Sequence, residues 1–122
     1  MIEHRPLGKS FLYAFEGVYY ALKHNQNFRI HFLIAILVVL VSIFLKVNLL
    51  EMAILGVMIL LVISAEMINA SIEQMVDLIV TEHRKEAKIA KDVAAGMVLV
   101  TSIGSVIVGL LILVPYLTRL LI

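Results

Sequence analysis

The residues of this chain most suited to chemistry begin where an apolar run ends at Ala65. Oxygen-bearing side chains then recur every three or four positions: Glu66, Asn69, Glu73 and Asp77. At about 100° per residue, a helix places these four side chains within roughly one quarter of its circumference, and we call them the stripe. An ionisable residue at the edge of a membrane helix costs about 2.5 to 3.5 kcal/mol on insertion scales, so the stripe indicates a functional site. For Glu66 alone, the alternative is a residue that ends the hydrocarbon segment and pairs with an interfacial lysine.

Magnesium-dependent phosphoryl transfer is a reaction that this stripe could support. It needs carboxylates that hold the metal on the phosphates, a cation for the developing charge, a base for the attacking hydroxyl and exclusion of water. Glu73 suits the first role, Lys91 the second, and the deeper Glu66 suits a base that faces a lipid hydroxyl. No glycine-rich loop of the form G-x-x-x-x-G-K-[ST] occurs. A kinase built on this chain would therefore use no P-loop.

The composition places the chain in a membrane. Its 122 residues are 62% hydrophobic and their mean hydropathy is +1.07, which is typical of a membrane protein. The net charge of +1 offers no clustered basic surplus for a nucleic-acid partner. The absence of cysteine excludes disulfides and thiol chemistry.

We expect an all-α fold, with three transmembrane helices and an amino-terminal amphipathic helix that lies in the membrane interface. Residues 7–24 form the interfacial helix, because its apolar side chains share one face: Leu7, Phe11, Phe15, Val18 and Leu22. The alternative for this segment is an amphipathic helix packed only on protein. The three spans are predicted at residues 28–47, at residues 50–72 with an extension to about 82, and at residues 90–115, all in one membrane domain of residues 1–122.

The depth and orientation of the stripe follow from the second span. The apolar residues 52–65 extend about 21 Å as a helix, which places Glu66 near the far edge of a hydrocarbon core of about 30 Å. Lys and Arg are unevenly divided between the two faces: Arg5, Lys9, Lys23, Arg29, Arg84, Lys85, Lys88 and Lys91 on one, Lys46 and Arg119 on the other. The positive-inside rule therefore predicts that the amino terminus and residues 73–92 are cytoplasmic.

These motifs together resemble the signature of the small prokaryotic diacylglycerol kinase family. The resemblance rests on two stretches: Glu66-x-x-Asn69-x-x-x-Glu73-x-x-x-Asp77 and Ala87-Lys88-Ile89-Ala90-Lys91-Asp92-x-Ala94-Ala95-Gly96. It implies a homotrimer of three-span subunits in the bacterial cytoplasmic membrane, with active sites at the cytoplasmic interface. It also implies that phosphate passes from MgATP to a lipid alcohol. Because each subunit carries one face of a site, we expect the sites to be shared between neighbours.

The resemblance also assigns roles by position. Glu66 would be the general base, Glu73 a metal ligand that also contacts the nucleotide, and Asn69 an active-site support. The remaining polar groups would organise ATP and its phosphates: Asp77, Lys91 and Asp92. Arg5 and Lys9 could reach a phosphate, or their side chains could snorkel to the interface.

The chain departs from the family pattern at two positions. The family commonly places a second metal-binding Glu two residues before an Asn-Phe-Arg-like sequence, where this chain has Asn25. An amide oxygen can ligate magnesium but lacks the charge, so we expect weaker binding of a second metal. Arg84 stands where the family has the His of a Glu-x-His sequence, and we interpret it as a phosphate contact.

The expected substrate is undecaprenol, with diacylglycerol as the alternative. The stretches Asn27-Phe28-Arg29-Ile30-His31 and Gly109-Leu110-Leu111-Ile112-Leu113-Val114-Pro115 resemble the branch from Gram-positive bacteria, whose members mostly phosphorylate undecaprenol. A non-enzymatic oligomeric membrane subunit is the alternative of a different class, and it predicts ion flux without dependence on Lys91. His24 and His31 have no third ligand at metal spacing, so we interpret them as interface anchors, not as a zinc site.

Overall fold

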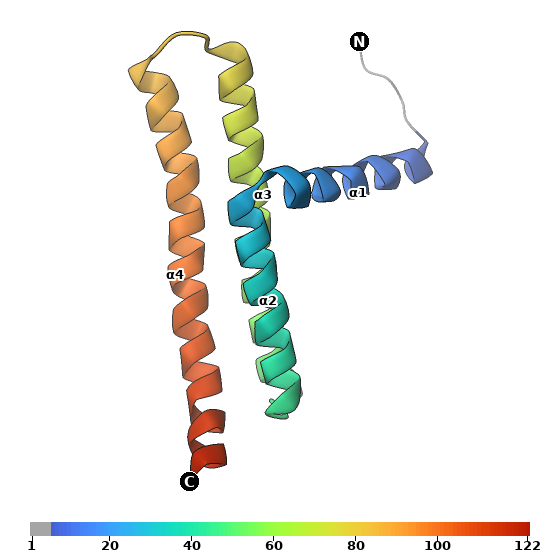
Figure 1. The fold of residues 1–122 in the computed structure, drawn as a ribbon, viewed down its shortest axis with the longest axis vertical. Helices are drawn as coiled ribbons and strands as arrows, with labels where there is room; N and C mark the ends of the chain where they lie inside the picture. Colours follow the sequence, from blue (N-terminus) through green and yellow to red (C-terminus); the bar gives the residue numbers. More distant parts are fainter. Residues whose placement is uncertain (1–5) are drawn as a thin grey trace.

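The computed structural model describes residues 6–122, and all regular structure in this part of the chain is helical (Figure 1). The helices are α1 (Leu7–His24), α2 (Gln26–Phe44), α3 (Leu49–Ile79) and α4 (Lys85–Leu121). By length and composition, α2, α3 and α4 are able to cross a membrane. The all-α prediction with three apolar spanning helices is therefore confirmed.

Both α3 and α4 are longer than a bilayer requires. They contain 31 and 37 residues, or about 46 and 55 Å of helix, against a hydrocarbon core of about 30 Å. Figure 1 shows the two helices continuing side by side beyond the level of α1, to the loop of residues 80–84 that joins them. The polar half of the stripe on α3 therefore belongs to a helical hairpin that extends past the apolar segment.

The helix α2 ends at Phe44, three residues before the end of the first span predicted from the sequence at residue 47. Val47 N–H donates to the Ser42 carbonyl and Lys46 N–H to the Ile43 carbonyl, each at 3.1 Å. These two bonds form a Schellman motif, which satisfies the last carbonyls of the helix and needs a left-handed residue. Lys46 adopts that conformation, with φ of 56°. The helix α2 therefore ends at Phe44, and Asn48 caps α3 by accepting from Glu51 N–H at 2.8 Å.

The helix pair α3 and α4 forms most of the packed interior, and α2 lies against α3. Few side chains are fully buried, and the apolar ones among them include Phe28, Leu55, Val62, Ala65 and Ala94. The described chain exposes 9,493 Å², whereas a compact soluble monomer of this mass exposes about 6,600 Å². Much of the apolar surface of the helices is thus left for lipid or for other subunits to cover.

The first helix runs sideways from the bundle (Figure 1). It meets α2 at Asn25, whose side-chain Oδ1 accepts from Phe28 N–H at 3.1 Å and so caps α2. Tyr20 ties the helix to α3, because its hydroxyl accepts from Gln74 Nε2 at 3.3 Å. The side chains of Leu7 and Phe15 are more than two thirds exposed. The contacts of Asn25 and Tyr20 hold the end of α1 against the α3 stripe.

Candidate functional site

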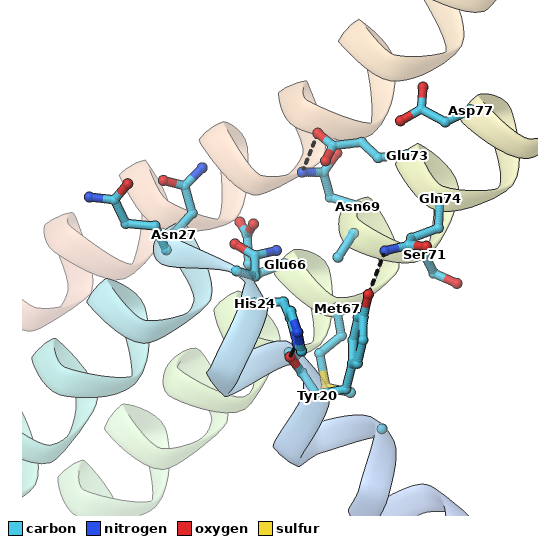
Figure 2. Close-up of a pocket in the computed structure, with 15 residues that line it drawn as sticks. Tyr20, His24, Asn27, Glu66, Met67, Asn69, Ser71, Glu73, Gln74 and Asp77 are labelled. Carbon is cyan, nitrogen blue, oxygen red and sulfur yellow. Dashed lines mark hydrogen bonds between the residues drawn. The ribbon is translucent and has the colours of Figure 1, made fainter. Parts of the chain in front are cut away.

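A cavity of about 710 Å³ opens between the end of α1, the turn into α2 and the stripe on α3 (Figure 2). We call it the outer cavity. Five residues that the sequence analysis selected line it: Asn25, Glu66, Asn69, Glu73 and Asp77. The other lining residues include Tyr20, His24 and Gln74, and the His24 ring stacks on Tyr20 at 4.2 Å between centroids. The predicted stripe therefore lines one side of the outer cavity.

The stripe changes in character along α3. Glu66 is 2% exposed and Asn69 is 6% exposed, whereas Glu73 and Asp77 are exposed to solvent. Asp77 lies eleven positions after Glu66, which corresponds to a rise of about 16 Å along the helix. The stripe thus runs from an enclosed carboxylate at the membrane end to a solvated carboxylate at the water end.

The middle of the stripe offers oxygen ligands. Asn69 Nδ2 donates to Glu73 Oε1 at 3.5 Å, and the buried Asn69 Oδ1 has no hydrogen-bond partner among residues 6–122. A buried polar atom without a partner is rare, and a bound water or ion is one explanation for it. Together with the Glu73 carboxylate, this amide oxygen fits the oxygen preference of Mg²⁺. No group of three His, Asp or Glu side chains able to hold a metal occurs within the described residues.

The enclosed carboxylate has a neighbour on α2. His31 Nε2 lies 4.0 Å from Glu66 Oε2, and the His31 side chain is 24% exposed. From the sequence, His31 was interpreted as an interface anchor and not as part of the site. A usable signal was its position one helical turn after the apolar Phe28, which puts both side chains on one face of α2.

Two exposed ion pairs mark the water end. Lys91 Nζ donates to Asp77 Oδ1 at 2.5 Å and thereby joins α4 to the stripe. One turn away, Lys88 Nζ donates to Asp92 Oδ2 at 2.6 Å. This hydrogen bond raises the pKa of Lys88 above its usual value, so the ammonium is charged at neutral pH. Exposed pairs of this kind contribute little to stability, because water and salt screen them.

Three predicted site residues lie away from the outer cavity in the single chain. Asp92 is turned toward Lys88, and Arg84 lies in the loop of residues 80–84, where its Nη2 is 4.0 Å from Glu82 Oε2. Lys9 is exposed in the first turn of α1, at the end remote from α2 (Figure 1). Arg5 lies outside the described residues.

Asn25 occupies the outer cavity but already has a structural contact. Its Oδ1 accepts from Phe28 N–H and caps α2. An amide oxygen has two lone pairs, so one remains for another partner. The residue that would hold a second metal is therefore both uncharged and engaged in a helix cap.

Comparison with known proteins agrees with the geometry. Residues 12–113 match the family model described as prokaryotic diacylglycerol kinase. The chain is 41% identical over 114 residues to a diacylglycerol kinase of Synechocystis, in a match that covers 93% of this chain and 65% of that protein. It is 38% identical over 107 residues to an undecaprenol kinase of Bacillus subtilis, covering 88% of this chain and 87% of that protein.

The chain thus spans just under two thirds of the Synechocystis relative and most of the Bacillus relative. The two relatives carry the names of kinases for different lipids, and the family match takes in the whole outer-cavity stripe on α3. The family resemblance predicted from the sequence is confirmed, and the chain belongs to the prokaryotic diacylglycerol kinase family.

Proposed function

We propose that this member of the family is a membrane kinase that transfers the γ-phosphoryl group of MgATP to the hydroxyl of undecaprenol. One observation carries the proposal: a single helix presents an enclosed carboxylate and a solvated one to the same cavity. A lipid hydroxyl arrives from the hydrocarbon side and ATP from water, so a kinase joining them needs a site that spans this boundary.

Glu66 serves as the general base at the membrane end. It accepts the proton of the lipid hydroxyl while that oxygen forms a bond to the γ-phosphorus, and the bond from this phosphorus to the β–γ bridging oxygen breaks to release ADP. The low exposure of Glu66 supports the role, because it keeps bulk water from competing with the lipid hydroxyl.

Glu73 and Asn69 are the residues that would hold Mg²⁺. Their fit rests on the Glu73 carboxylate and on the buried Asn69 Oδ1 that lacks a partner in the described chain. When bound, the metal neutralises charge on the phosphates. Asn25 adds only a neutral oxygen that already caps α2, so we propose that a second Mg²⁺ binds weakly.

Asp77 and Lys91 form the nucleotide end of the site. Lys91 is held at the rim by its contact with Asp77, where its ammonium can balance negative charge on the phosphates. Arg84 and Asp92 complete the nucleotide contacts in this proposal, although neither lines the outer cavity of its own chain.

That separation supports a homotrimer with shared sites. Lys9, Arg84 and Asp92 lie away from the cavity of their own chain, and the chain exposes more total surface than a compact monomer of its mass would. We propose that these residues reach the site of a neighbour, and that Arg5 does the same. Mixing Glu66→Gln with Asp92→Asn subunits tests this, because mixed trimers regain activity if one site takes its base from one chain and its Asp92 from a neighbour. Mixtures that stay inactive would contradict sharing.

The cavity opens to the bacterial cytoplasm in this proposal, with the amino terminus and residues 73–92 on that side and α1 in the membrane interface. Lys46 lies in the turn at the opposite end of α2, which fits the uneven division of basic residues. Cysteines introduced at Glu82 and Lys46 test the orientation. A membrane-impermeant maleimide added to intact cells should label only the second.

The choice between the two lipids is tested by competition. Purified protein in mixed micelles receives ATP, Mg²⁺ and equal mole fractions of undecaprenol and diacylglycerol. Undecaprenol is favoured by the sequence features of the Gram-positive branch and by the name of the Bacillus relative. Diacylglycerol remains the second candidate because the Synechocystis relative, at 41% identity, is named a diacylglycerol kinase. A higher kcat/KM for diacylglycerol would replace our assignment, and phosphorylation of neither lipid would overturn it.

A further inference from the structure

The Glu66–His31 contact lies between two cavities. Glu66 lines the outer cavity, whereas His31 lines a second cavity of about 150 Å³ that we call the inner cavity. The inner cavity lies between α2, α3 and α4, and most of its lining side chains are apolar, as in Leu55, Ile59 and Val62. The pair therefore joins the water-facing site to the apolar interior.

The position of His31 is fixed by the start of α2. Asn25 caps this helix at Phe28 N–H, and the Phe28 side chain is 1% exposed. The Phe28 ring also stacks on Phe32, with centroids 6.2 Å apart. His31 follows Phe28 by three residues and Ala35 follows His31 by four, so these side chains share the face of α2 that is covered by the bundle. These contacts hold the backbone of α2 at His31 beside Glu66 on α3.

Glu66 has few other partners. Among residues 6–122 no hydrogen bond reaches its carboxylate, and His31 is the one basic group within 4.0 Å. A carboxylate enclosed to this degree needs a partner to stay in a defined orientation. The distance of 4.0 Å exceeds a direct hydrogen bond, but catalytic contacts are often long without substrate and shorten in the complex.

The surrounding titratable groups are placed for other contacts. On α1, His24 lies against Tyr20, with its Nδ1 3.2 Å from the Tyr20 carbonyl oxygen. On α2, the Arg29 guanidinium donates to the Lys23 carbonyl at 3.2 Å. On α3, Glu73 is bonded to Asn69, and from α4 the polar side chains that line the inner cavity are the hydroxyls of Ser102 and Ser105.

We propose that His31 is the positioning residue of the base. Its Nε2–H donates to Glu66 Oε2 and thereby leaves the other carboxylate oxygen, Oε1, free to accept the proton of the lipid hydroxyl. His31 itself touches no reacting atom. This inference rests on the proposed kinase function and adds a residue that the stripe on α3 does not contain.

Three substitutions of His31 separate the loss of its hydrogen-bond donor from a change in side-chain packing. His31→Leu keeps an apolar side chain of similar size but removes the donor, whereas His31→Gln places an amide N–H near the position of Nε2. We expect His31→Ala and His31→Leu to lower kcat by about 10- to 100-fold, part of the roughly 10² to 10⁴ that a general base contributes. The KM for MgATP should stay within twofold, and His31→Gln should recover activity to within about threefold of the wild type. His83→Leu, a change in the exposed loop, is the matched control and should leave both constants unchanged.

A double-mutant cycle tests whether His31 acts through Glu66. If it does, His31→Leu lowers kcat in the wild type but has no further effect in Glu66→Gln, because the carboxylate that it positions is already gone. Equal losses in both backgrounds, or equal activity of the Leu and Gln variants, would overturn the inference. Elution volume and melting temperature in detergent show that each variant is folded. An inactive wild type or a fully active Glu66→Gln would instead overturn the proposed function, so the two failures are distinguishable.

Discussion

The two ends of the α3 stripe use the same kind of side chain in opposite surroundings. At the membrane end, Glu66 is 2% exposed and its basic neighbour within the described chain is a histidine 4.0 Å away. At the water end, the Asp77 side chain is 66% exposed and is bonded to Lys91. Figure 2 shows both groups along one helix, with Asn69 and Glu73 between them. Sequence spacing alone does not distinguish these carboxylates, whereas their burial does.

The difference indicates which carboxylate is tied to function. An exposed ion pair such as Asp77–Lys91 contributes little to stability and is screened by salt, so a bound nucleotide can rearrange it at little cost. A buried carboxylate contributes little net stability, because the cost of its desolvation offsets its attraction to a partner. Glu66 is therefore better explained by proton transfer than by folding. Substitutions along the stripe should reveal this contrast.

The largest effect is expected at Glu66. Glu66→Gln keeps the shape of the side chain and removes the base, so kcat should fall by about 10² to 10⁴ while the protein remains folded. Radiolabelled ATP and extraction of the lipid product measure the rate. Glu16→Gln, an exposed acid on α1 that does not line the outer cavity, is the control and should keep wild-type turnover. Activity above one tenth of the wild type in Glu66→Gln would contradict the proposed functional difference between the membrane end and the water end of the stripe.

A smaller effect is expected at Glu73, halfway along the stripe. Glu73→Gln retains an oxygen but loses the charge that Mg²⁺ prefers, so the Mg²⁺ concentration for half-maximal rate should rise by roughly 10-fold or more. A Mg²⁺ titration at constant MgATP measures this. Glu86→Gln changes an exposed acid in the first turn of α4 and should leave the titration curve in place. An unchanged curve for Glu73→Gln would exclude this carboxylate as the ligand.

At the water end, Lys91→Ala should lower kcat/KM for MgATP by about 10-fold, because one charge-assisted contact to phosphate is lost at an exposed position. The free energy of unfolding should stay nearly unchanged, because an exposed ion pair contributes little to stability. Lys85→Ala is the control, since Lys85 is an exposed lysine at the start of the same helix and has no place in the proposed site. If Lys85→Ala is as damaging as Lys91→Ala, the loss reflects general surface charge instead of a site contact.

The sequence was sufficient for the helices and for the stripe, because both depend on local periodicity. Apolar runs predict α2, α3 and α4, and the spacing from Glu66 to Asp77 predicts one shared face. The His31–Glu66 contact was not predictable in this way, because it depends on how α2 packs on α3, between residues far apart in the chain. The Schellman turn at Lys46 was missed for another reason, since this left-handed position usually holds glycine.

The separation of the predicted nucleotide residues could not be derived from the motif either. Lys91 and Asp92 are adjacent in sequence, but consecutive helical side chains point about 100° apart. In the structure Lys91 therefore turns toward Asp77 on α3, and Asp92 turns toward Lys88 on its own helix. Family resemblance assigns both residues to one site without saying whether one chain supplies them.

The smallest effect is expected from Asn25→Asp. Aspartate is as good a helix cap as asparagine, so the bond to Phe28 N–H and the start of α2 should be preserved. The substitution also adds a carboxylate to the outer cavity, where the chain has only a neutral oxygen. We expect the Mg²⁺ concentration for half-maximal rate to fall by about two- to fivefold, because charge strengthens oxygen ligation of a hard cation.

Asn48→Asp provides the matched control for this gain, because Asn48 also caps a helix but lies at the α2–α3 turn, on the opposite side from the outer cavity in our proposal. It adds the same charge to the chain, so a general electrostatic effect on Mg²⁺ would appear in both variants. A shift in Asn25→Asp alone would mean that the cavity accepts a second metal once a carboxylate is supplied. If neither variant shifts the titration, the helix cap uses the oxygen at residue 25 fully, and the metal site is limited to the Asn69–Glu73 portion of the stripe.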